Sequence, residues 1–152
     1  SKLLEFDEPK SFFVDASNDS SFLFIKCSSL IQVKFAYPSS VLSINDYAFS
    51  NCISLEQIAI PSSVIEIKES AFSECSSLAL VSFDEPSSIK VIDFYAFNRC
   101  TSLYQINIPS PIKIIKSYAF YECPLLMEMS IGDSIKKVGN NVFNSYIVIN
   151  LV

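Results

Sequence analysis

One stretch decides the fold: Val64-Ile65-Glu66-Ile67-Lys68-Glu69-Ser70-Ala71-Phe72-Ser73-Glu74-Cys75-Ser76-Ser77-Leu78. Two aliphatic residues three positions apart are followed by Ala-Phe, then by a cysteine and, three residues later, by a leucine. The same outline returns over residues 41–55, 89–103 and 112–126, and a weaker copy runs over 135–146. The chain is therefore built from repeats.

The five cysteines mark one position in each repeat, because they lie 25, 23, 25 and 23 residues apart. At 152 residues, half of them apolar, the chain is long enough for one domain with a substantial core. We predict a single domain over 1–152, with an irregular N-terminal repeat at 1–26 and a polar loop at 15–21. About five regular repeats of 23–25 residues follow over 27–146, and 147–152 forms a C-terminal strand or a truncated repeat. The cysteines are Cys27, Cys52, Cys75, Cys100 and Cys123.

Each repeat contains a Leu-x-x-Ile-x-Ile pattern, whose last two apolar residues face the same side of a strand. These predicted strands lie within 30–35, 55–60, 78–83, 103–108 and 126–131. A turn former follows each one. The two 25-residue periods carry an extra pair before the turn, Ala36-Tyr37 and Asp84-Glu85, which predicts small bulges at one corner. The segment Leu3-Leu4-Glu5-Phe6-Asp7-Glu8-Pro9 resembles 80–86 and predicts an opening strand and turn.

A second short strand is predicted next, followed by one turn of α- or 3₁₀-helix. That turn would place Ala48, Phe49 and Cys52 on one inward face. The three residues predicted to cap such turns are Asp46, Ser117 and Asn140.

A single repeat cannot fold alone. It offers about eight apolar side chains worth at most ~3 kcal/mol each, whereas ordering its residues costs roughly 1.5 kcal/mol apiece. Stacking the repeats one strand spacing apart buries both sides of every apolar side chain. The sequence therefore predicts a solenoid in which Phe49, Phe72, Phe97 and Phe120 lie in file.

Composition argues against several classes of function. The net charge is −5, Arg99 is the only arginine and there is no histidine, which disfavours nucleic acid as a partner. No apolar run approaches the ~20 residues of a membrane-spanning helix. Lys90, Lys113, Lys136 and Lys137 form a modest row, which we interpret as a solvated face.

We interpret the cysteines as small buried hydrophobes. A disulfide between neighbouring columns is disfavoured by parallel side chains, and zinc by the lack of histidine and of a local Cys-x-x-Cys pair. The repeated serines, such as Ser77 and Ser102, are interpreted as partners of local backbone. No nucleophilic triad and no glycine-rich phosphate loop is present, so we predict no cofactor and no enzymatic activity.

Outward strand positions form the candidate binding face. Glutamine columns can also hydrogen-bond along the stack, and that structural interpretation remains open. The group Leu80, Tyr104 and Met127, set among amides, has the character of a protein-recognition surface. The candidate residues are Gln32, Lys34, Glu56, Gln57, Leu80, Ser82, Tyr104, Gln105, Asn107, Met127 and Glu128.

The repeated Leu-x-x-Ile-x-Ile-Pro-x-x-Val-x-x-Ile-x-x-x-Ala-Phe-x-x-Cys-x-x-Leu, clearest over 55–78, resembles the BspA-like class of leucine-rich repeats. The resemblance implies a right-handed coil with parallel strands on the concave face and short strands or helical turns elsewhere. It also implies a cell-surface or secreted adhesion protein of bacteria or of parasitic or commensal protozoa, with a protein (host or self) or glycan as partner. An intracellular, cytoplasmic scaffold of the same architecture is the alternative. The family often has glycine after the second strand, where this chain has Asn45, Lys68, Asp93 and Lys116.

The ends of the chain support two further expectations. The segment 146–152 is mostly apolar to its last residue, which predicts either end-to-end association of chains or truncation from a longer array. Ser1 is not an initiator methionine, so the chain looks like an excised or processed piece. Asn18-Asp19-Ser20 is a glycosylation sequon, which would be used only if the protein is secreted.

Overall fold

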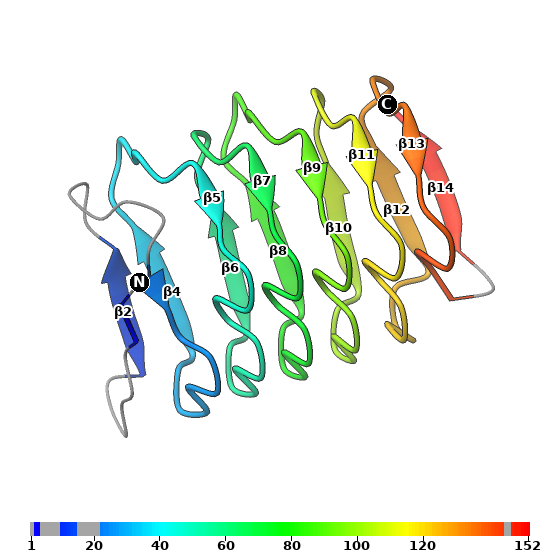
Figure 1. Cartoon of the computed structure of the whole chain (residues 1–152). Helices are drawn as coiled ribbons and strands as arrows, with labels where there is room; N and C mark the ends of the chain where they lie inside the picture. Colours follow the sequence, from blue (N-terminus) through cyan, green and yellow to red (C-terminus); the bar gives the residue numbers. More distant parts are fainter. Residues whose placement is uncertain (1, 4–9, 15–21, 145–146) are drawn as a thin grey trace.

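The computed structural model describes residues 2–3, 10–14, 22–144 and 147–152. These residues form a sheet of seven parallel strands in the order β14-β12-β10-β8-β6-β4-β2 (Figure 1). Successive strands come from successive repeats, so the chain coils as a solenoid, as predicted. The strands are β2 (Ser11–Val14), β4 (Gln32–Phe35), β6 (Gln57–Ile60), β8 (Leu80–Phe83), β10 (Gln105–Ile108), β12 (Glu128–Ile131) and β14 (Val148–Leu151).

A second, narrower parallel sheet lies on the other side of the coil, in front of the first in Figure 1. Its strands have two residues each and follow the order β13-β11-β9-β7-β5. In β5, β7, β9 and β11 the second residue is buried and the first is half-buried. The strands are β5 (Ser43–Ile44), β7 (Glu66–Ile67), β9 (Val91–Ile92), β11 (Ile114–Ile115) and β13 (Lys137–Val138).

The N-terminal repeat differs from the prediction. A short strand β1 (Lys2–Leu3) pairs with β3 (Phe22–Leu23), apart from both larger sheets. The first strand of the seven-stranded sheet is β2, which the sequence analysis did not assign. The rest of the predicted opening unit, the predicted loop at 15–21 and Asn18 lie outside the described residues.

The corner after each short strand is a series of β-turns, so the prediction of a helical turn is wrong. Ala48 N donates to Asn45 O at 3.1 Å, and Cys52 N donates to Phe49 O at 3.1 Å. The third residues of these two turns, Tyr47 and Asn51, both have φ near 59°. A right-handed helix needs negative φ throughout, whereas a turn of this kind accepts a positive value at its third residue. The corresponding residues of other repeats with positive φ are Lys26, Ser70, Glu74, Tyr95, Arg99, Tyr118, Glu122 and Asn141.

Hydrogen bonds between repeats replace those of the predicted helical turn. Phe49 N donates to Ala71 O of the next repeat at 2.7 Å. Two of the residues predicted as caps also bond to the next repeat, but as acceptors: Asp46 Oδ1 accepts from Glu69 N at 3.1 Å, and Ser117 Oγ accepts from Asn140 N at 3.0 Å. These polar side chains therefore join neighbouring repeats and do not cap a turn of their own. The residues in the glycine slot, Asn45, Lys68, Asp93 and Lys116, are not among those with positive φ, so their conformation tolerates side chains.

The positive φ predicts an unusual ranking of substitutions at Lys26, which is exposed and has φ 60°. Glycine adopts this conformation without the steric cost that alanine meets, so Lys26→Gly should be more stable than Lys26→Ala by about 1 kcal/mol in urea unfolding. At Glu56, which is exposed and lacks a positive φ, alanine should be the more stable of the two. The same ranking at both sites would contradict the assigned backbone conformation.

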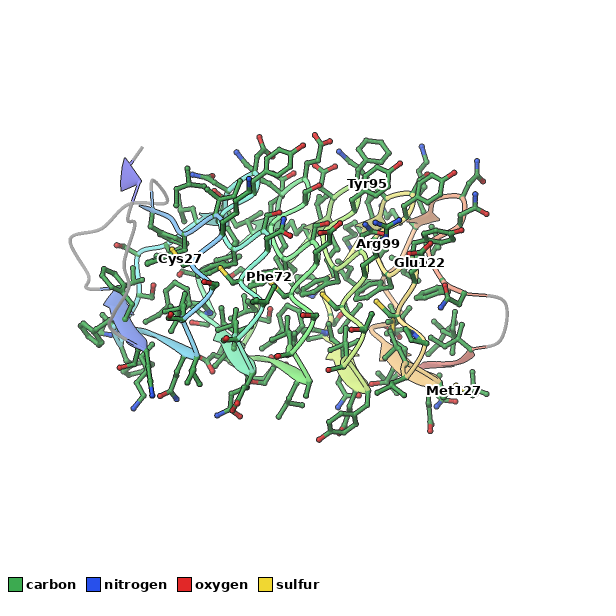
Figure 2. All side chains as sticks on the ribbon, turned by 90° about the horizontal axis from the view of Figure 1, so that it is seen from below. Cys27, Phe72, Tyr95, Arg99, Glu122 and Met127 are labelled. Carbon is green, nitrogen blue, oxygen red and sulfur yellow. The ribbon has the colours of Figure 1, made fainter. Side chains whose placement is uncertain are left out.

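The core is organised around a file of phenylalanine rings. Phe72 lies in the interior of the coil (Figure 2), parallel to Phe49 and Phe97, with centroid distances of 5.1 Å to both rings. Phe120 continues the file at 5.2 Å from Phe97, so the predicted alignment of these rings is confirmed. Phe24 and Phe143 extend it at the two ends.

The cysteine column lies beside this file, and all five cysteines are buried and carry thiols that are not joined in disulfides. Cys75 Sγ lies 3.0 Å from Phe49 O, and Cys100 Sγ lies 3.1 Å from Phe72 O, so each thiol donates to a carbonyl of the preceding repeat. Cys52 and Cys123 repeat this contact. The cysteines are thus buried, as predicted, and they also tie each repeat to its neighbour.

Candidate functional site

The candidate residues belong to what we call the broad face, the outward side of the seven-stranded sheet and its border. In β6 the exposed Gln57 and Ala59 alternate with the buried Ile58 and Ile60. Strand register aligns Gln32, Gln57, Leu80 and Gln105 in one column and Ala59 with Ser82 in the next. At the border, Tyr104 N donates to Ala79 O and Ala79 N donates to Glu56 O.

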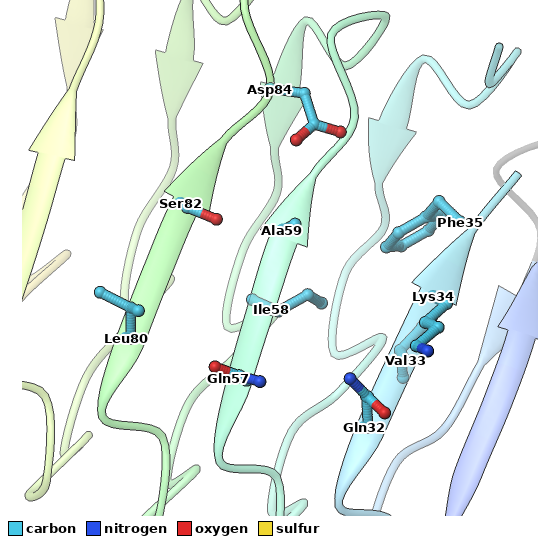
Figure 3. Close-up of a pocket in the computed structure, with 10 residues that line it drawn as sticks. All are labelled: Gln32, Val33, Lys34, Phe35, Gln57, Ile58, Ala59, Leu80, Ser82 and Asp84. Carbon is cyan, nitrogen blue, oxygen red and sulfur yellow. The ribbon is translucent and has the colours of Figure 1, made fainter. Parts of the chain in front are cut away.

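One recess of the broad face lies where β4 and β6 separate. These two strands pair only at Gln32 and Gln57, whereas β6 and β8 pair over four residues. The opening leaves a groove of about 390 Å³. Figure 3 shows Lys34 projecting from β4 and Asp84 from the chain beyond β8, with β6 between them. The groove therefore has a cation on one side and an anion on the other, with Gln57 and Ala59 of β6 between them.

Two features of the sequence explain this opening. The extra pair Ala36-Tyr37 lengthens the turn after β4. In addition, the residue that follows β6 is Pro61. The equivalent residue after β8 is Asp84, whose backbone N–H donates to Ile60 O of β6. Proline has no amide hydrogen, so this bond cannot form between β4 and β6.

The same combination recurs two repeats later. The pair Asp84-Glu85 follows β8, and Pro109 follows β10. The register between β8 and β10 ends after Val81 and Ile106, and a second groove of about 210 Å³ lies there. The two strand pairs separated by 25 residues, β4–β6 and β8–β10, therefore both lose their pairing toward the turn, and a groove lies at each of them.

A third recess, of about 290 Å³, lies at the C-terminal part of the broad face. Its polar lining is cross-linked between strands: Ser130 Oγ donates to Asn107 Oδ1 at 2.7 Å, and Asn150 Nδ2 donates to Glu128 Oε1 at 2.6 Å. Tyr104 borders this recess and is 54% exposed. Met127, labelled in Figure 2, is 61% exposed and directly precedes Glu128, which lines the recess, so this part of the chain exposes two large apolar side chains.

Within the described residues, the glutamine column makes no hydrogen-bonded ladder. No side-chain hydrogen bond is recorded between Gln32 and Gln57, and Leu80 separates Gln57 from Gln105. Gln57 and Gln105 are exposed. Their amide groups are therefore free to hydrogen-bond to a ligand.

Three residues of the broad face were missed by sequence reasoning. Phe13 lies beside Lys34 by strand register and is exposed, while Asp84 and Asn150 line two of the recesses. The signal for Phe13 was the four-residue pattern of 11–14, which matches 32–35. The resemblance of 3–9 to 80–86 places the predicted opening strand before Lys10 instead, and so hides this pattern.

The described residues offer little for nucleophilic or metal chemistry. They contain no group of three or more Cys, Asp, Glu or His residues able to hold a metal ion. Burial raises the pKa of the Cys52 thiol to about 12 and that of Cys100 well above its ordinary range, so both stay protonated at neutral pH. In the described part of the chain, no helix has the length and apolar character needed to cross a membrane.

The stacked parallel strands and the turn-rich corners define a leucine-rich repeat solenoid. The model of the BspA type leucine-rich repeat region matches residues 19–150 in six copies, and the chain belongs to this family. Leucine-rich repeats generally serve in protein interaction and are generally non-enzymatic. No curated protein sequence matches the chain.

Solved structures of bacterial leucine-rich repeat proteins resemble this fold. A leucine-rich repeat protein of T. pallidum matches with 28% identity and a TM-score of 0.67, covering 75% of this chain and 52% of its own. One from Bacteroides ovatus matches with 20% identity and a TM-score of 0.54, covering 94% of this chain and 54% of its own. The chain thus spans about half the length of these proteins.

Proposed function

We propose that this chain is a non-enzymatic recognition module whose broad face binds a protein or glycan partner, in the context of adhesion at a cell surface. The supporting observation is the combination of Tyr104 and Met127, both exposed, with amide-lined recesses on a face held by a continuous sheet. Rigid aromatic anchors surrounded by adaptable polar groups are typical of protein-binding surfaces.

The rigidity of the solenoid supports this function energetically. The backbone of a preformed sheet loses little conformational freedom on binding, so more of the contact energy remains as affinity. The three recesses lie at different strand pairs, which allows an extended partner to contact several of them at once. We favour a surface or secreted location because it follows from the family resemblance, with an intracellular scaffold as the alternative. End-to-end association of chains stays a prediction.

The test compares two variants of equal apolar loss. Tyr104→Ala with Leu80→Ser alters the broad face, and the control, Tyr47→Ala with Ile53→Ser, removes exposed side chains of the same kinds from outside the seven-stranded sheet. Immobilised wild type and both variants would be exposed to host and self extracts. Bound proteins would be quantified and the affinity of each for the wild type measured.

We expect that at least one protein or glycoprotein binds both to the wild type and to the control variant. The broad-face variant should bind it at least about tenfold more weakly, because loss of a hot-spot anchor costs about 2 kcal/mol or more. Equal affinity of all three chains for every retained partner would refute the assignment of the broad face.

A further inference from the structure

Three lysines lie in one file at the edge of the five-stranded sheet. Lys113 N donates to Lys90 O at 2.9 Å, and Lys136 N donates to Lys113 O at 2.8 Å, so each occupies the same position in successive repeats. Lys137 follows in β13. Lys90, Lys136 and Lys137 are exposed and Lys113 is half-buried. We call these four residues the lysine row.

The lysine row differs from the other charged files of the chain. Arg99 lies between Glu74 and Glu122, at 3.4 Å and 2.7 Å from their carboxylates, and Lys116 pairs with Asp93 at 3.0 Å. Within the described residues no ion pair or side-chain hydrogen bond is recorded for the lysine row. Like charges on neighbouring strands repel, and the chain has more acidic than basic residues. The row is therefore an unfavourable arrangement that a bound anion would relieve.

The acidic side chains of the same sheet do not neutralise the row. Glu66 hydrogen-bonds to Asp93, and Asp93 pairs with Lys116, which also lies 5.1 Å from the centroid of the Phe94 ring. Burial raises the pKa of the Glu66 carboxyl, and the hydrogen bond with Asp93 raises it further. The lysines that lower it are Lys68 and Lys116, not those of the row.

Apolar side chains continue the file of lysines toward the N-terminus. Lys90 N donates to Ile65 O, and Ile65 N donates to Leu42 O, so these two residues precede Lys90 in the same file. Leu42 is 57% exposed and Ile65 is 41% exposed. A ligand that covers the whole file therefore needs apolar groups at one end and anionic groups at the other. Protein segments provide both, whereas sulfated glycans carry no apolar side chains.

We propose that Lys90, Lys113 and Lys136 of the lysine row, together with Ile65 and Leu42, bind a helix of a partner protein that lies along the axis of the solenoid. One face of this helix carries carboxylates on three successive turns and apolar side chains on the next two. The spacing supports a helix: neighbouring strands lie about 4.8 Å apart, and an α-helix rises about 5.4 Å per turn. Over three lysines the mismatch is about 1.2 Å, which flexible lysine stems absorb. Carboxylates on successive turns then meet Lys136, Lys113 and Lys90.

The probe is a synthetic fluorescent helical peptide of five turns, with glutamate facing one side on three turns and leucine on the next two. A second peptide of the same composition has its glutamates distributed around the helix. Binding is measured by fluorescence anisotropy at low and high salt. The row variant carries Lys90→Gln, Lys113→Gln and Lys136→Gln. The control variant carries Lys10→Gln, Lys26→Gln and Lys34→Gln, which removes the same charge elsewhere on the molecule.

We expect the row variant to bind the first peptide about tenfold more weakly than the wild type, and the control variant to bind it as the wild type does. Binding should weaken with salt, because exposed charges are screened. The broad-face variant Tyr104→Ala with Leu80→Ser should bind the peptide normally, which separates this proposal from the proposed function.

Equal binding of both peptides, or equal loss in both lysine variants, would overturn the proposal. So would tighter row-dependent binding of heparin or of phosphatidylserine vesicles than of the first peptide. In that case a sulfated glycan or an anionic membrane would be the better assignment. Because the substitutions remove repulsion between exposed lysines, the row variant should fold at least as stably as the wild type.

Discussion

Replacing Phe72 with alanine is expected to lower the free energy of unfolding by about 3–5 kcal/mol. Phe72 is fully buried and stacks between Phe49 and Phe97, so both neighbours would lose a packing partner at once. The cavity would lie between repeats, where neighbouring faces provide most of the stability of a solenoid. The measurement is denaturant unfolding with linear extrapolation to water.

Phe94 provides a matched control for this experiment. It is also a phenylalanine, but it is partly exposed and contacts Lys116 through its ring. Phe94→Ala should cost about 1 kcal/mol or less, the value of an exposed cation–π contact. If the two variants lost equal stability, the aligned rings would not be the main source of cohesion between repeats.

The ring file was predictable because residue spacing alone fixed it. Each of Phe49, Phe72, Phe97 and Phe120 precedes a cysteine by three residues, so any stacked arrangement of equal repeats brings them together. Strand faces were predictable for the same reason, since Ile58 and Ile60 alternate with polar or small residues. Periodicity carries this information without knowledge of the backbone path.

The corner conformation was not predictable from residue types. Positive φ usually appears in a sequence as glycine, but here the positions hold Tyr47, Glu74, Arg99 and other large residues. Each such residue costs about 1–2 kcal/mol in this conformation, and bonds between repeats, such as Phe49 N to Ala71 O, offset that cost. These bonds exist only in the stack and are invisible in a single repeat.

The sequence predicted the irregular corners next to two of the broad-face recesses, but not the recesses themselves. The extra residues Ala36-Tyr37 and Asp84-Glu85 indicated irregular corners, and the structure shows that they lie next to open strand pairs. The consequence for strand pairing also depends on Pro61 and Pro109 in the following repeat. The sequence motif of a single repeat does not show this dependence, because the extra pair and the proline belong to neighbouring repeats.

The cysteine column predicts a steep loss of stability in alkaline solution. An unfolded cysteine loses its proton near its ordinary pKa of 9.0, whereas burial raises the pKa of Cys52 and of Cys123 to about 12. Burial also raises the pKa values of Cys75 and Cys100 well above that range. Between pH 9 and 12 the native state therefore holds protons that the unfolded state has lost, so stability falls as pH rises.

The size of this effect is considerable. Each thiol contributes a loss of about 1.4 kcal/mol per pH unit in this window, so Cys52 and Cys123 together remove about 4 kcal/mol by pH 10.5. Cys75 and Cys100 add losses of the same sign. Because a domain of this kind has a total stability of about 5–15 kcal/mol, we expect unfolding near pH 10–11 under reducing conditions.

Tyrosine and lysine titrate in the same range, so the slope of stability against pH must be compared between variants. The double variant Cys52→Ala with Cys123→Ala lacks two of the thiols whose protons the native state retains and the unfolded state loses. Its unfolding free energy should therefore fall less steeply between pH 9.5 and 11, by about 2.7 kcal/mol per pH unit. Urea unfolding at several pH values measures both slopes. Parallel curves for the variant and the wild type would mean that the thiols are already ionised in the native stack, which is incompatible with their burial and with the contact from each Sγ to a phenylalanine carbonyl.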